Sequence, residues 1–121
     1  MFDGLDNVTS IDLAHLDTSC ATSMAAMFQC CYSLANIEFG DFNTSNVTDM
    51  SFMFNFCFAL EEVDLSSFNT SKVTNMACMF QCCEMLEEID VSGFDTANVE
   101  YMFNMFADCD ALTELNLLNF D

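Results

Sequence analysis

Two consecutive stretches of the chain decide its fold. Residues 46–71 read NVTDMSFMFNFCFALEEVDLSSFNTS, and residues 72–97 read KVTNMACMFQCCEMLEEIDVSGFDTA. The same pattern extends in both directions with a period of 26 residues. Matching residues recur at this spacing in columns: Met24, Met50, Met76 and Met102; Phe28, Phe54, Phe80 and Phe106; Cys31, Cys57, Cys83 and Cys109; Leu34, Leu60, Leu86 and Leu112. Such a period is typical of solenoids, whose stacked units share one continuous core.

Each unit is predicted to contain one short strand and one helix. Residues 63–65 are apolar, acidic and apolar in turn, and this alternation indicates a half-buried strand. Between Val73 and Cys83 the apolar residues are spaced as on one face of a helix, and Thr70 and Ser71 can cap its first turn. We therefore expect an α/β fold, a right-handed solenoid similar to leucine-rich repeats. It would have one short parallel strand and one helix in each 26-residue repeat.

The repeats predict a single solenoid domain over residues 1–121, with about four and a half repeats. The complete units are 9–34, 35–60, 61–86 and 87–112, with partial units at both ends. Neither end has a polar capping unit, which solenoids generally need for solubility. We therefore expect the chain to be part of a longer protein, or to stack through its uncapped ends on another subunit.

Composition restricts the classes of partner and function. The chain has 121 residues, 53% of them hydrophobic, and 20 acidic residues against the single basic Lys72, for a formal net charge of −19. The hydrophobic content excludes a disordered acidic tail, and the acidity argues against nucleic acid and anionic lipid as partners. No apolar run is long enough to cross a bilayer and no signal peptide is recognisable, so we expect no direct membrane insertion. With one His, one Lys and no Gly-rich loop, we do not expect an enzyme.

Cysteine is unusually frequent, at eight residues. The column that begins with Cys31 is predicted to be buried, where Cys fills space as a small apolar side chain. Disulfides between neighbouring units and a metal bound by thiols are the alternatives. So many unpaired thiols favour a reducing compartment.

The side chains between the buried positions of the predicted strands are acidic. The candidate partner-binding residues are Glu38, Glu62, Asp64, Glu88, Asp90 and Glu114. This face either only keeps the protein soluble, or binds a basic protein segment, or holds Ca²⁺ between oxygen ligands. No other metal or cofactor is expected. Separately, Phe52, Phe56 and Phe58 lie between the repeat columns and predict an apolar patch that docks another protein or a lipid-facing surface.

The two quoted units resemble the 26-residue repeats of the BspA-like surface-protein family, also described as mycoplasma lipoprotein repeats of unknown function. The usual repeat of that family contains V-T-x-M-x-x-M-F-x-x-C-x-x-L-x-x-L-D-L-S-x-F-D-T-S, and the chain is similar to it over essentially its whole length. The resemblance implies a leucine-rich-repeat-like solenoid that serves adhesion or protein binding, without catalytic residues. It also implies a cell-surface location, whereas the many apparently free cysteines favour an intracellular or virion-associated one.

We therefore expect a non-catalytic protein-binding or adhesion module that presents an acidic concave strand face to a protein partner. One alternative is a structural scaffold subunit within a larger assembly, such as a virion or an algal or protist complex. Another is a solenoid that binds divalent cations through the same acidic face.

Overall fold

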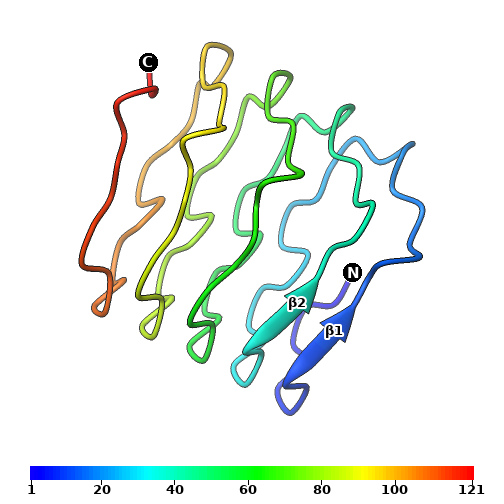
Figure 1. Cartoon of the computed structure of the whole chain (residues 1–121), viewed down its shortest axis with the longest axis vertical. Helices are drawn as coiled ribbons and strands as arrows, with labels where there is room; N and C mark the ends of the chain where they lie inside the picture. The colour runs from blue at the N-terminus through cyan, green and yellow to red at the C-terminus, as the bar shows by residue number, and fades with distance from the viewer.

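The computed structural model describes residues 1–121, and in it the chain winds into a stack of coils that lie side by side (Figure 1). A coil is defined here as one 26-residue turn of the stack. The only regular elements are two strands, β1 (Ser10–Asp12) and β2 (Asn36–Glu38). They pair in parallel, with Ile11 opposite Ile37. No helix is present that could span a membrane.

The predicted α/β solenoid, with a helix in every unit as in leucine-rich repeats, is wrong, because the structure contains no helix. The segment predicted to be helical is a series of overlapping turns in each coil. In the second such segment, the Met53 N–H donates to the Met50 carbonyl at 3.3 Å and the Cys57 N–H donates to the Phe54 carbonyl at 3.1 Å. The Phe54 N–H instead donates to the Met79 carbonyl of the next coil, at 2.9 Å. Alternate N–H groups thus bond within the coil and between coils.

Left-handed backbone at two positions in each coil prevents a helix from forming. The φ angles there lie between +55° and +61°. The residues concerned are Ala26, Cys30, Phe52, Phe56, Cys78, Cys82, Asn104 and Asp108. A residue in this conformation cannot continue a right-handed helix, and for a residue other than glycine it costs roughly 1–2 kcal/mol.

The turns nevertheless bury the same side chains that a helix would bury. Met24, Met27, Phe28 and Cys31 all point into the core, although the backbone between them is not helical. The apolar spacing is therefore satisfied by two different backbone conformations. This is the physical reason why the periodicity misled the prediction.

The distance between coils also excludes helices. Stacked rings in the central Phe column lie 5.4 Å apart between Phe28 and Phe54 and 5.2 Å apart between Phe54 and Phe80. Packed helices need about 8–10 Å between their axes, whereas paired strands need about 4.8 Å. The stack therefore keeps a spacing close to that of strands on the side where helices were expected.

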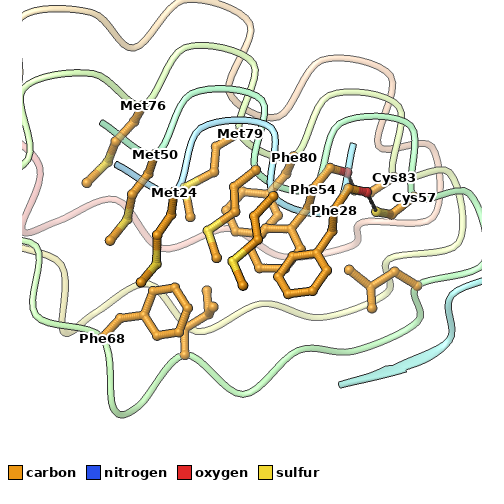
Figure 2. Packing of buried hydrophobic residues seen from close by; sticks show 14 of the residues in the cluster. Met24, Phe28, Met50, Phe54, Cys57, Phe68, Met76, Met79, Phe80 and Cys83 are labelled. Carbon is orange, nitrogen blue, oxygen red and sulfur yellow. Dashed lines mark hydrogen bonds between the residues drawn. The ribbon is translucent and has the colours of Figure 1, made fainter. Parts of the chain in front are cut away.

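The core is a set of parallel side-chain rows that run along the stack. Figure 2 shows the rings of Phe28, Phe54 and Phe80 in one row, with the side chains of Met50 and Met76 in another. None of these five residues has any exposed surface. Each coil thus buries its apolar residues against one another and against those of the coils next to it, as expected for a repeat protein.

The strand predicted in every unit is present in only two of them. Residues 62–64 and 88–90, which are equivalent to β2, are not strands. The paired strands place Ser10 opposite Asn36, Ile11 opposite Ile37, and the acidic Asp12 opposite the acidic Glu38. One pair of like charges is therefore compatible with strand pairing. Between the two following coils there would be two such pairs, Glu62 with Glu88 and Asp64 with Asp90, and like charges directly opposite each other destabilise strand pairing.

The threonines predicted to cap helices join neighbouring coils instead. The Thr70 hydroxyl donates to the Asp95 carbonyl at 3.0 Å and accepts from the Asp95 N–H at 2.8 Å. Thr44 makes the same pair of bonds with Asn69, at 3.0 and 2.7 Å. Both threonines are buried, and each satisfies two backbone groups of the next coil.

Candidate binding groove

One groove brings all the predicted partner-binding residues together. It has a volume of about 860 Å³ and extends across several coils, from the β2 segment toward the end of the chain. Its carboxylates are those of Glu38, Glu62, Asp64, Glu88, Asp90 and Glu114. Asn36, Thr113 and Asn116 also line it, and none of its lining residues is basic. We call this surface the acidic groove.

The floor of the acidic groove is apolar. Ile37, Val63 and Ile89 line it and are half-buried, with their inner sides packed against the core. The carboxylates on either side of them are exposed. This alternation is the one predicted from the sequence, and it survives although most of these segments are not strands.

The backbone in the middle of the acidic groove is unpaired. Residues 62–64 and 88–90 neither donate nor accept a backbone hydrogen bond, unlike residues 36–38, which pair with β1. Between these two coils, on this side of the stack, the Glu87 N–H donates to the Glu61 carbonyl at 3.1 Å. Free N–H and C=O groups of an exposed segment are available to the main chain of another polypeptide.

Two carboxylates of the groove are held by local turns. The Asp64 carboxylate accepts the Ser66 N–H at 2.9 Å, and the Asp90 carboxylate accepts the Ser92 N–H at 2.9 Å. Hydrogen bonds from the side chain and the backbone of that serine hold the pKa of each carboxyl group below its ordinary value. Both groups are therefore ionised at neutral pH, and their orientation is fixed before any partner binds.

The structure offers no preformed metal centre. No group of three or more His, Cys, Asp or Glu side chains is placed to hold a metal ion. The carboxylates of the acidic groove are spread over several coils and do not converge on one point. The single cation, Lys72, lies outside the groove, where its ammonium group donates to Asn46 Oδ1 at 2.9 Å.

All eight cysteines are free thiols. Those in the repeat column donate to a phenylalanine carbonyl of the preceding coil, at 3.2 Å both from Cys57 to Phe28 and from Cys83 to Phe54. Burial is the main cause that raises the pKa of both thiols, which keeps them neutral and unreactive. The predicted burial of this column is confirmed for Cys31, Cys57 and Cys83.

The aromatic patch predicted at Phe52, Phe56 and Phe58 is only partly assembled. The rings of Phe56 and Phe58 meet edge to face at 5.9 Å, while Phe52 contacts neither ring. The sequence analysis missed Tyr32, whose ring stacks on Phe58 at 5.2 Å. The signal was available, because these two residues stand one period apart.

The fold and the groove together define a class of repeat protein: a stack of coils with buried Phe and Met rows and an acidic groove across the coils. Residues 1–120 match DUF285, a family described as Mycoplasma protein of unknown function, and the chain belongs to that family. This match confirms the expected relationship to a mycoplasma protein family. It does not assign the chain to the BspA-like proteins in particular. No curated protein and no solved structure matches the chain.

Proposed function

We propose that the protein is a non-catalytic binding module whose acidic groove holds an extended, basic segment of a protein partner. One observation carries this proposal. Six exposed carboxylates and the unpaired backbone of residues 62–64 and 88–90 line the same groove, in which no residue is basic.

The two kinds of group would recognise different parts of such a segment. Carboxylates attract lysine and arginine side chains and speed the encounter between partners. Free backbone groups offer hydrogen bonds to any extended main chain, whatever its sequence. The half-buried Ile37, Val63 and Ile89 add an apolar floor against which side-chain stems can pack.

The similarity of the repeats to BspA-like surface proteins supports adhesion at a cell surface as the setting of this binding. The family that the chain matches is described only as being of unknown function, so the partner is defined here by its chemistry.

The test compares two variants that lose the same charge. In the groove variant Glu62, Glu88 and Glu114 are changed to Gln. In the control variant the exposed Asp41 and Asp121 are changed to Asn and the exposed Glu100 to Gln, all outside the groove. A lysine- and glycine-containing peptide is titrated against each at about 0.15 M salt, where long-range attraction is largely screened. We expect the groove variant to bind about tenfold more weakly than the unmodified chain, because each exposed ion pair contributes about 0.2–1 kcal/mol.

Each other outcome has a distinct meaning. Equal weakening in both variants would contradict the proposal and indicate attraction by overall charge alone. A peptide methylated on alternate backbone nitrogens should bind more weakly than its unmethylated counterpart, and equal affinity would exclude a role for the free backbone groups. If Ca²⁺ stabilises the chain and the groove variant abolishes that effect, the groove is a cation site instead.

A further inference from the structure

A second surface, next to the acidic groove, carries exposed aromatic rings. Tyr32 and Phe58 stack with ring centroids 5.2 Å apart and planes inclined by 12°, and Phe56 meets Phe58 edge to face. Tyr32 is 41% exposed and the other two residues are half-buried. We call this cluster the aromatic ridge. It does not belong to the core, where the stacked rings of Phe28 and Phe54 have no exposed surface.

Acidic residues continue the line of the ring pair in both directions. Asp6, Tyr32, Phe58, Glu84 and Asp110 are spaced by one period each and therefore occupy one column of the stack. Hydrogen bonds between coils fix this register nearby, from the Cys30 N–H to Asn55 and from the Phe56 N–H to Gln81, both at 2.9 Å. The two stacked rings face each other along this column. The outer face of the Tyr32 ring is therefore turned toward the coil that carries Asp6, and that of the Phe58 ring toward the coil that carries Glu84.

Acidic groups lie close enough to the aromatic ridge to affect the pKa values of its neighbours. The pKa of the Tyr32 hydroxyl is raised, first by its hydrogen bond with Cys30 and further by the negative charges of Asp6 and Asp3. The pKa of the Cys82 thiol is raised by burial and then by Asp108, with smaller effects from Glu84 and Asp110. No basic side chain neutralises this surface, since Lys72 bonds Asn46 elsewhere.

We propose that the aromatic ridge and its flanking carboxylates bind arginine side chains of a protein partner. A guanidinium group is planar, so it can stack on an exposed ring face and pair with a carboxylate at the same time. A lysine ammonium is a compact, strongly hydrated charge that gains less from stacking. Charge complementarity selects a cation, and the rings select arginine among the cations.

The residues of the aromatic ridge directly precede those of the acidic groove in each coil. Tyr32 stands four residues before Asn36, Phe58 before Glu62, and Glu84 before Glu88. The turns that lead into β2 and its equivalents lie along one edge of the stack (Figure 1). An arginine-bearing segment can therefore occupy both surfaces, but the preference for arginine is a property of the ridge alone and is separate from the proposed function of the groove.

The experiment measures the ratio of affinities for two peptides. One contains arginine and glycine, the other lysine and glycine, with the same length and charge. We expect the unmodified chain to bind the arginine peptide about two- to fivefold more tightly than the lysine peptide, because guanidinium groups stack on the exposed rings. The double variant Tyr32→Ala, Phe58→Ala should bind both peptides equally. Tyr32→Phe, which keeps the ring, should retain the preference.

The controls separate the ridge from the groove and from misfolding. Phe103→Ala removes an aromatic ring that is 59% exposed but lies outside the ridge, and it should leave the ratio unchanged. The groove variant should weaken both peptides without changing their ratio. Thermal unfolding of each variant shows whether it is folded, and Tyr32→Ala alone, at an exposed position, provides a milder test.

Several results would overturn the inference. Equal affinity of the unmodified chain for both peptides would refute the ridge while leaving the groove proposal intact. A preference that persists in the double variant would place the arginine site elsewhere. A preference lost in the double variant, together with no effect of the groove variant, would support the ridge and refute the groove. Failure of both peptides to bind would refute both proposals.

Discussion

At the scale of single residues, the path of each coil depends on left-handed backbone at residues that are not glycine. Ala26, with φ of +55°, and Cys30, with φ of +58°, show the pattern. The strain is compensated because the coil that results pairs its backbone with the next coil and buries a row of large side chains. Glycine would adopt this conformation without strain.

Changing Ala26 to Gly should therefore stabilise the protein by roughly 0.5–1 kcal/mol, since relief of strain exceeds the greater flexibility of unfolded glycine. The neighbouring Ala25, which is also half-buried but has no positive φ, provides the matched control. Ala25→Gly should destabilise by about 0.5–1 kcal/mol. Guanidinium unfolding of both variants checks the prediction, and equal loss of stability would show that the left-handed conformation carries no strain.

The buried thiols should make the fold sensitive to alkali. Burial raises the pKa of Cys57 and Cys83 above the ordinary value of 9.0, so these thiols ionise in the unfolded chain before they ionise in the folded one. Stability is fully present below about pH 9 and is lost as the pH rises toward the folded-state pKa, by at most about 1.4 kcal/mol per pH unit for each thiol. Unfolding under reducing conditions across this range should show the loss. The variant Cys57→Ala, Cys83→Ala should show a shallower slope, and an identical slope would argue against the thiols as its cause.

At the scale of elements, buried threonines add a further link between coils to the backbone hydrogen bonds. The Thr70 hydroxyl both donates to and accepts from the Asp95 backbone, and Thr70 is buried. Thr70→Val keeps the shape of the side chain but leaves the N–H and C=O groups of Asp95 without their partner. Each hydrogen bond contributes about 0.5–1.5 kcal/mol, so the loss of both costs about 1–3 kcal/mol.

We expect Thr70→Val to lower the free energy of unfolding by about 2 kcal/mol. The same change at Thr22, which is exposed and whose hydroxyl makes no hydrogen bond, should alter it by less than about 0.5 kcal/mol. Chemical denaturation measures both. If the two variants lose equal stability, the hydrogen bonds of the Thr70 hydroxyl contribute nothing to stability.

In the same coils, the sequence predicted which side chains are buried but not the conformation of the backbone that carries them. The apolar columns at Met50, Phe54 and Cys57 predicted which side chains are buried, because burial depends on spacing. They could not predict the backbone between them, because the left-handed residues Phe52 and Phe56 are of types that give no such signal. The groove followed from the alternation of acidic and apolar residues. The absence of strands at residues 62–64 and 88–90 did not, because their polar–apolar–polar alternation is the same as in β2.

At the scale of the whole molecule, the net charge of −19 opposes the compact state. The column of Glu62, Glu88 and Glu114 concentrates this repulsion within the acidic groove. Salt screens exposed charges, with a Debye length that falls from about 30 Å at 0.01 M to about 3 Å at 1 M. Stability should therefore rise with ionic strength.

Raising sodium chloride over this range should increase the Tm by roughly 5 °C, which corresponds to about 1 kcal/mol for a domain of this size. The groove variant should start from a higher Tm in low salt and gain less from the added salt. Scanning calorimetry at neutral pH measures both effects. A Tm that does not change with salt would show that the carboxylates do not strain the fold.

The hydrogen bonds that join each coil to the next have a mechanical consequence. Pulling on the two ends of the stack would load one ladder of bonds at a time, because each coil contacts only its neighbours. The chain would peel open in steps, each releasing one coil of 26 residues, or about 90 Å of extended polypeptide. A protein attached at both ends would then lengthen in equal steps under tension. The coils that are still folded would retain their part of the acidic groove and its binding.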